Sequence, residues 1–314
     1  MKLRFVINPR SGRHRRNAGI LELVQAFVSG RALDAEVVTT QGPGHATDIA
    51  RDAVAAGCQR IVALGGDGTV NEVAQALIHT PAAMGLVPCG SGNGLALHLG
   101  LPTGLAEALE LAAAPFARVA ELDTGTVNGL PFVNAMGLGL DADVSCRFNR
   151  LVRRGLPAYT RTALAAFLSR RTERCTISAG AHRETLDTLL IAVANSDQYG
   201  NNAKIAPHAR VDDGMLDLVA VRPTGFFGAA ILGARLFLGS IDRSPGVRRL
   251  RGSRFLIERP SSGIVHTDGE THMASACVEV LVRPRSLKFV VPTDCSAVAP
   301  AGERAAAGFA LQLP

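Results

Sequence analysis

The chain has 314 residues, of which 47% are hydrophobic and 19% charged, and it carries a net charge of +6. Without low-complexity tracts or repeats, this composition indicates a globular protein with room for two domains, and it excludes a disordered or repeat protein. The basic charge favours nucleotides, nucleic acid or anionic lipid as partners without choosing among them.

The first third of the chain alternates strands and helices. Apolar runs predict strands at 3–7, 35–40 and 60–64, and helical spacing predicts helices at 18–29, 47–56 and 69–78. This alternation indicates parallel strands joined by right-handed crossovers, so we predict an α/β, doubly wound, mostly parallel sheet over residues 1–123. Ligands collect at the carboxyl edge of such a sheet. The glycine loops after Ile7, Leu64 and Pro88 should meet there.

The pattern changes near residue 123. Strands at 124–127 and 131–135 around Asn128-Gly129 are typical of a hairpin. Further strands are predicted at 188–194, 216–221, 254–257, 278–282 and 287–291, with helices at about 144–153 and 224–238. We therefore predict a second, mostly antiparallel β domain over residues 124–291.

Targeting and redox signals are absent from the sequence pattern. The start, MKLRFVINP, has too few consecutive apolar residues to form the apolar region of a signal peptide, so export is not expected. The longest apolar run, 226–238, is interrupted by Arg235 and is shorter than the roughly 20 residues that cross a bilayer. The six cysteines include no C-x-x-C pair, which argues against zinc and disulfide frameworks. We expect a cytoplasmic protein with no transmembrane segment.

The loop GGDGT places Asp67 among glycines at 65, 66 and 68, ahead of a predicted helix. Open glycine backbone and a helix N-terminus favour a phosphate. An ionised Asp67 about 4 Å from a phosphate charge would be repelled by around 4 kcal/mol at an effective dielectric of 20. Either a divalent cation or a substrate hydroxyl would offset this repulsion, and phosphoryl transfer uses both. The alternative is that Asp67 caps the following helix.

Three other segments could contribute to the same edge. NPRSG (8–12) follows the first strand, and PCGSGNG (88–94) follows the fourth. Each alone is ordinary turn chemistry, whereas three glycine loops on one predicted edge are not. Far downstream, HTDGETH (266–272) brings Asp268 and Glu270, which are either a hairpin turn or a second carboxylate at the cleft.

Six segments, in this order, resemble the diacylglycerol kinase catalytic family, which includes the sphingosine and ceramide kinases and a bacterial lipid kinase branch. They are NPRSG (8–12), GGDGTVNEV (65–73), PCGSGNGLA (88–96), NAMGLGLDADV (134–144), ANSDQYGNNAKIAPHARVDDGMLDL (194–218) and DGE (268–270). The resemblance covers nearly all of the chain. It departs from the bacterial pattern at Gly94 and Leu97, where aspartate and arginine are usual, and GSGN is closer to the sphingosine kinase version.

The resemblance implies ATP as donor, Mg²⁺, and a lipid hydroxyl as acceptor, in a cleft between an α/β domain and a β-sandwich. By position, Glu270 would accept the proton and Asp67 would be its essential partner. A return of the chain near Pro292 would complete the first domain with 292–314. The implied nucleotide contacts are Asn8, Pro9, Arg10, Ser11, Gly12, Thr40, Gly65, Gly66, Gly68, Thr69, Asn71, Ser91 and Asp268.

A structural magnesium is also implied by the resemblance. It would match the Asp213 side chain and the backbone carbonyls of Arg210 and Met215, and oxygen ligands suit a hard cation. The DDG segment is equally compatible with a solvated turn.

The resemblance also implies that residues within 141–155 contact the lipid acceptor. By resemblance, Asp141 and Asp143 would contact the lipid head group, and Arg153 and Arg154 would contact phosphates. A solvated helix face is an equal alternative. For the apolar segment 226–238, core packing is favoured over lining an acyl slot or touching a bilayer.

Two other functions compete with a lipid kinase. One is a soluble kinase resembling NAD kinase, whose glycine loop is similar, and the other is a non-catalytic nucleotide or lipid sensor. We expect a lipid substrate at the inner face of the membrane, reached by peripheral contact, and no nucleic-acid partner. The sequence leaves open the acceptor lipid, the immediate base and a homodimer.

Overall fold

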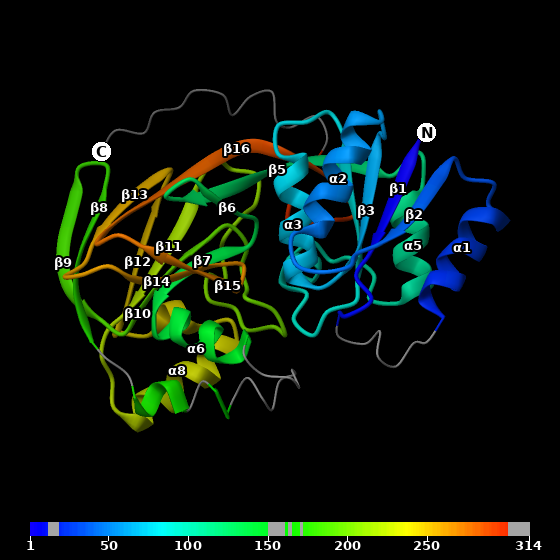
Figure 1. Ribbon diagram of the computed structural model, residues 1–314. Helices are drawn as coiled ribbons and strands as arrows, with labels where there is room; N and C mark the ends of the chain where they lie inside the picture. Colours follow the sequence, from blue (N-terminus) through cyan, green and yellow to red (C-terminus); the bar gives the residue numbers. More distant parts are fainter. Residues whose placement is uncertain (12–18, 150–160, 163–164, 170–171, 301–314) are drawn as a thin grey trace.

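The computed structural model describes residues 1–11, 19–149, 161–162, 165–169 and 172–300. Figure 1 shows an α/β half and a β half lying side by side. Within the described residues, one ten-stranded sheet runs in the order β2-β1-β3-β4-β16-β13-β8-β9, with β5 and β6 paired off this path. A second sheet of six strands runs in the order β12-β11-β10-β7-β14-β15.

The α/β half is built on four parallel strands with helices on both faces. The strands are β1 (Leu3–Ile7), β2 (Ala35–Thr39), β3 (Arg60–Gly65) and β4 (Ala83–Pro88). One face packs against α2 (His45–Ala55) and α3 (Asp67–Leu77), and the other packs against α1 (Ile20–Gly30) and α5 (Leu105–Ala113). The predicted doubly wound sheet is confirmed.

The β half is a sandwich of the second sheet on the far end of the first. The first sheet contributes β5 (Arg118–Val127), β6 (Leu130–Phe132), β8 (Glu173–Ala179), β9 (His182–Thr188), β13 (Arg254–Glu258) and β16 (Cys277–Val291). The second contains β7 (Ala135–Gly139), β10 (Leu190–Ala194), β11 (Leu216–Val221), β12 (Val247–Gly252), β14 (Gly263–Thr267) and β15 (Glu270–Ala274). Their inner faces share one core, which includes Phe132, Met136 and Phe255. The predicted antiparallel β domain is confirmed.

Strand β16 joins the two halves. It pairs in parallel with β4, in the α/β half, and antiparallel with β13, in the sandwich. The sequence predicts two strands here, at 278–282 and 287–291, because Pro284 interrupts the run. In the structure the strand continues through an irregularity between Arg283 and Leu287, where the pairing with β5 changes register.

Other local predictions differ from the structure. The predicted strand 131–135 divides, because β6 ends at Phe132 and β7 begins at Ala135 in the other sheet. The domain boundary at residue 123 stays a prediction and lies within β5, while Cys295 and Val298 lie in the core of the α/β half, in keeping with a first domain completed by the chain after Pro292. Helices α4 (Gly94–His98) and α5 were not predicted.

Helices α6 (Leu140–Asn149) and α8 (Phe226–Phe237) lie on the outer face of the second sheet (Figure 1). No residue of α8 is fully buried, but Leu232 and Leu236 are partly buried against a core cluster on the second sheet. The prediction that 226–238 packs in the core therefore holds for one side of the helix and not for the other. Among the described residues, the helices are too short or too polar to span a bilayer.

Candidate active site

The glycine loops meet at the carboxyl edge of the parallel sheet, as predicted. Strands β1, β3 and β4 are neighbours, so the loops that follow them lie side by side. The Asn8 side-chain amide donates to Thr69 Oγ1 over 2.9 Å, which ties the first loop to the second. The Cys89 N–H donates to the Gly65 carbonyl over 2.8 Å, which ties the third loop to the second.

Two of the loops touch through their glycines. A Cβ added to Gly90 would lie 2.5 Å from Gly66 Cα, and a Cβ added to Gly66 would lie 3.0 Å from Gly90 Cα. A contact of 2.5 Å against backbone excludes a side chain at Gly90, and the 3.0 Å contact leaves little room for one at Gly66. The sequence pattern therefore reflects packing of loop on loop in addition to open backbone for a ligand.

Asp67 is bonded to the third loop. As the first residue of α3 it does not cap its own helix; its carboxylate accepts the N–H groups of Asn93 (3.0 Å) and Gly94 (2.8 Å) at the start of α4. A Cβ on Gly92 would lie 2.7 Å from Asp67 Oδ2. Burial raises the pKa of Asp67 to about 6, although the two N–H donors oppose the shift. The neighbouring loop thus supplies the donors that stabilise this charge.

Asp268 connects the two halves of the molecule. Its carboxylate accepts the Asn71 side-chain amide (2.7 Å) from α3 and the N–H groups of Val133 (2.8 Å), Asn134 (2.8 Å) and Ala135 (2.9 Å) between β6 and β7. Burial raises the pKa of Asp268, and these donors oppose the shift. With four donors on two oxygens, the side chain fixes the turn of the β14–β15 hairpin against α3.

That hairpin brings Glu270 to the glycine loop. Glu270 is the first residue of β15, pairs with Thr267 across the turn, and has an exposed side chain. Its Oε1 lies 3.6 Å from the position that a Cβ on Gly68 would occupy. Glu270 and Asp67, 203 positions apart in the sequence, thus border the same loop from the two halves.

The remaining predicted nucleotide contacts differ in exposure. Pro9, Arg10 and Ser91 are exposed at the loops, whereas Thr40 and Asn71 are buried. The Thr40 N–H donates to the Ile7 carbonyl over 2.8 Å, which holds the end of β2 beside β1. The Ser11 N–H donates to the Asn8 carbonyl over 3.2 Å, and Gly12 lies outside the described residues.

On the acceptor side, Asp141 is buried at the start of α6. Its Oδ2 accepts the Tyr199 hydroxyl over 2.6 Å and lies 3.0 Å from His266 Nε2. Asp143 is only partly buried. The solvated-face alternative therefore does not describe Asp141. Arg153 and Arg154 lie outside the described residues.

The predicted magnesium set is partly engaged by protein groups. Asp213 forms an ion pair with Arg251 and accepts the Met215 N–H over 3.0 Å. Burial raises the pKa of Asp213, Arg251 opposes the shift, and the charges of Asp123 and Asp217 add to it. The negative charges of Asp123 and Asp217 near Asp213 would favour a bound cation. Within the described residues, no three or more His, Cys, Asp or Glu side chains gather around one metal position.

A buried ionic group beside the third loop was missed. His98, the last residue of α4, places Nδ1 2.7 Å from Asp197 Oδ1, and Lys204 Nζ lies 3.1 Å from Oδ2. Burial alone would raise the pKa of Asp197, but His98 and Lys204 outweigh it and lower that pKa. The sequence feature that could have indicated this group is Asp197, a charged residue within the otherwise apolar and amide-rich run 190–203. Its partner His98 could not be inferred, because it lies 99 positions earlier.

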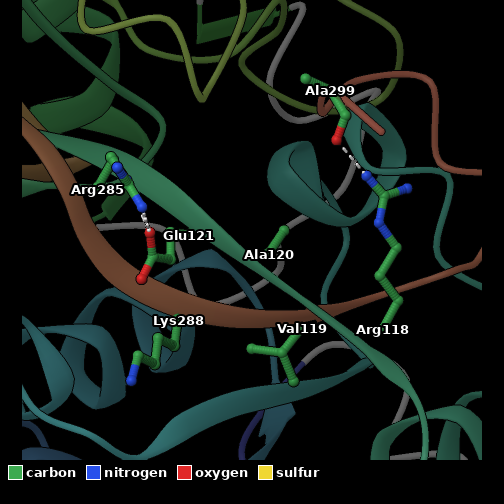
Figure 2. Close-up of a pocket in the computed structure, with 7 residues that line it drawn as sticks. All are labelled: Arg118, Val119, Ala120, Glu121, Arg285, Lys288 and Ala299. Atoms are coloured by element: carbon green, nitrogen blue, oxygen red, sulfur yellow. Dashed lines mark hydrogen bonds and ion pairs between the residues drawn. The ribbon is translucent and has the colours of Figure 1, made fainter. Parts of the chain in front are cut away.

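A hollow of about 450 Å³ lies elsewhere, against β5 and β16 (Figure 2). Its basic groups are engaged: Arg118 donates to the Ala299 carbonyl over 2.5 Å, and Arg285 Nε donates to Glu121 over 2.7 Å. Lys288 points away from that ion pair in Figure 2. Because its guanidinium groups already bind protein oxygens, this hollow is a weaker candidate for phosphate than the glycine loops.

Known proteins share both halves. A family model of the diacylglycerol kinase catalytic domain matches residues 2–127, and one of the YegS C-terminal NAD kinase beta sandwich-like domain matches residues 134–291. A "probable lipid kinase YegS-like" of Pseudomonas aeruginosa (strain UCBPP-PA14) is 31% identical over 288 residues, covering 89% of this chain and 92% of that protein. Another, of Enterobacter sp. (strain 638), is 28% identical over 266 residues, covering 82% and 87%.

The fold is shared with a solved structure of a "putative diacylglycerol kinase" from Bacillus anthracis str. Sterne. The TM-score is 0.77 at 22% identity, over 94% of this chain and 96% of that chain. The fold and the family models define a kinase-type enzyme, a class that uses a nucleotide. The chain belongs to the diacylglycerol kinase catalytic family, in its YegS-like lipid kinase branch.

Proposed function

We propose that the protein is an ATP-dependent lipid kinase that phosphorylates the primary hydroxyl of a lipid such as diacylglycerol or a sphingoid base. The observation that carries the proposal is the meeting of Glu270 with the glycine loop, since it puts an exposed carboxylate from the β half beside a phosphate-type loop of the α/β half. Phosphoryl transfer needs such a pairing of phosphate-binding backbone with a proton acceptor.

The loops at 8–11, 65–69 and 88–94 would hold the phosphates. Helix α3 begins in the second loop and points its positive end toward them. The exposed Arg10 and Ser91 would add donors from the first and third loops. The N–H groups of Asn93 and Gly94 keep the charge of Asp67 compatible with a nearby phosphate.

Glu270 would accept the proton of the lipid hydroxyl. The hydroxyl oxygen forms a bond to the γ-phosphorus of ATP, the bond from that phosphorus to the bridging oxygen breaks, and ADP leaves. Asp67 is the weaker candidate for this proton because both of its oxygens already accept backbone N–H groups. Its role would be to hold the third loop against the second.

The acceptor and the metal would lie at separate places. Asp141 and Asp143, at the start of α6, would contact the lipid head group, with Asp141 oriented by Tyr199 and His266. A structural Mg²⁺ would be held by the Asp213 side chain and the carbonyls of Arg210 and Met215, and Mg²⁺ bound with ATP would neutralise charge on the transferred phosphoryl group. The protein would work in the cytoplasm, in peripheral contact with a membrane.

Acceptor transfer tests the proposal. The purified protein is incubated with γ-labelled ATP, Mg²⁺ and, separately, diacylglycerol, sphingosine, ceramide and NAD. We expect label on one of the lipids. Transfer to NAD alone would instead identify a soluble kinase, and absence of transfer to any acceptor, with ATP still bound, would favour a sensor.

A further inference from the structure

Helix α8 presents an apolar face to solvent. Phe227, Ile231 and Leu238, spaced to lie on one side of the helix, are 83%, 57% and 78% exposed. Phe226 and Phe237 flank them and are 58% and 43% exposed. Monomeric proteins rarely leave large apolar side chains contiguous on the surface unless the patch binds something.

This exposure is not a failure to pack. The opposite side of α8 carries Leu232 and Leu236, which pack on the outer face of the second sheet near Ala192 and Val219. In Figure 1 the helix lies on the outside of the β half. Because the inner side already anchors the helix, the outer apolar side has no role in the sandwich core.

The charged side chains that flank α8 are mainly basic, and the carboxylate of Asp242, next to Arg243, is already paired with Arg249 and His208. Residues 218–241 contain no Asp or Glu, while Arg222 precedes the helix and Arg243 follows it in the short 3-10 helix η2 (Ile241–Arg243). Both arginines are exposed, and neither side chain has a hydrogen bond or ion pair to another residue in the part of the chain that the structure describes. Two free cations thus bracket the apolar face, which complements an anionic surface.

We propose that α8 docks the protein on an anionic lipid bilayer, an inference that rests on the proposed lipid kinase function and names the surface of its membrane contact. Phe227, Ile231 and Leu238 would enter the boundary between head groups and acyl chains. Arg222 and Arg243 would contact anionic head groups. A surface helix with large apolar side chains and nearby arginines binds lipid interfaces in this way.

The docking helix is linked to the active-site loops by one segment. The Leu236 carbonyl of α8 accepts the Lys204 N–H over 2.9 Å. Three residues earlier, the Asn201 N–H donates over 3.0 Å to the carbonyl of Gly92. Gly92 lies in the third glycine loop, whose N–H groups at Asn93 and Gly94 bind the Asp67 carboxylate. Residues 201–204 therefore contact both the membrane-facing helix and the active-site loop, so docking would place the active site near its lipid source.

Vesicle co-sedimentation without ATP tests the inference separately from the kinase activity. The full chain is mixed with vesicles of phosphatidylcholine alone and of phosphatidylcholine with phosphatidylglycerol. We expect binding to the anionic vesicles, a loss of about tenfold for each of Phe227→Glu and Ile231→Glu, and a loss of roughly fivefold for each of Arg222→Gln and Arg243→Gln.

The matched control is Phe116→Glu. Phe116 is 97% exposed but lies in the α/β half, between α5 and β5, so its replacement should leave vesicle binding unchanged. Circular dichroism and thermal unfolding show whether each variant is folded.

Equal binding by wild type and the α8 variants would overturn the inference, as would a wild type that does not bind. A wild-type dimer that Phe227→Glu converts to a monomer without vesicle binding would assign the face to a second copy instead. A kinase-inactive protein that still binds vesicles through α8 would refute only the proposed function.

Discussion

Two regions of the molecule depart from the usual distribution of polar and apolar groups, in opposite directions. At the glycine loops, the acidic side chains of Asp67 and Asp268 are largely withdrawn from water, and each accepts two or more N–H groups. On the outer face of the second sheet, α8 has no buried residue and exposes Phe227 and Leu238. Charge lies inside at one place and apolar surface lies outside at the other.

The difference shows how each departure is made stable. Buried carboxylates are tolerated because backbone donors compensate for lost water, which also fixes the loops in one arrangement. Exposed apolar groups have no such compensation within the protein, which is why we propose that a bilayer covers them. The first region is satisfied by groups of the chain itself, whereas the proposed role of the second depends on a partner.

The largest effect is expected at Glu270. Glu270→Gln removes the proton acceptor while keeping its size, so kcat for lipid phosphorylation should fall by about 10²–10⁴-fold with little change in the affinity for ATP. Steady-state kinetics and nucleotide binding measure the two quantities. Glu107→Gln, an exposed glutamate on α5, is the control and should keep wild-type kinetics. Full activity of Glu270→Gln would remove Glu270 from the mechanism.

The next effect is on stability, at Asp268. Asp268→Ala leaves the donors of Asn71, Val133, Asn134 and Ala135 without their acceptor, so the free energy of unfolding should fall by about 3 kcal/mol. Urea denaturation measures it. Asn71→Ala removes one donor and should cost about 1 kcal/mol. Equal losses for both variants would mean that Asp268 does not clamp the halves.

The pH dependence of stability should report Asp67. Its folded pKa, about 6, lies above the usual value of 3.8, so the folded state holds a proton that the unfolded state has lost between these values. Its contribution to stability is full below about pH 4 and is lost as the pH rises to 6, on the order of 2–3 kcal/mol. Urea denaturation of wild type and Asp67→Asn across this range should show wild type losing stability relative to the variant. Parallel pH profiles would contradict the raised pKa.

The smallest effect separates the two sides of α8. Leu232→Ala, on the packed side, should lower the free energy of unfolding by about 1–2 kcal/mol, because Leu232 is only partly buried. Phe227→Ser, on the exposed side, should change it by less than about 0.5 kcal/mol. Thermal unfolding in the absence of lipid measures both. A larger loss for Phe227→Ser would show that its ring packs within the protein.

Local patterns predicted much of the fold. The strand at 3–7 and that at 216–221 match β1 and β11, since short buried runs with clear ends identify a strand without knowledge of its partners. The three loops were placed on one edge because parallel topology dictates it. Helix α5, LAEALELAA, has helical spacing that could have been recognised.

Long-range partners were beyond the sequence pattern. The sequence argument named a cation or a substrate hydroxyl as the compensation for the charge of Asp67, and it could not find the N–H donors at Asn93 and Gly94, which lie 26 and 27 residues later. The Asp268 partner Asn134 lies 134 residues earlier. The core assignment of α8 holds for only one side of the helix, because an apolar segment does not reveal which of its sides is covered.

The most direct measurement is a crystal structure with Mg²⁺ and a non-hydrolysable ATP analogue. We expect the phosphates between the loops at 65–69 and 88–94, with the γ-phosphate facing Glu270. Nucleotide bound in the hollow beside Arg118, or anywhere remote from Asp67, would contradict the assignment of the active site.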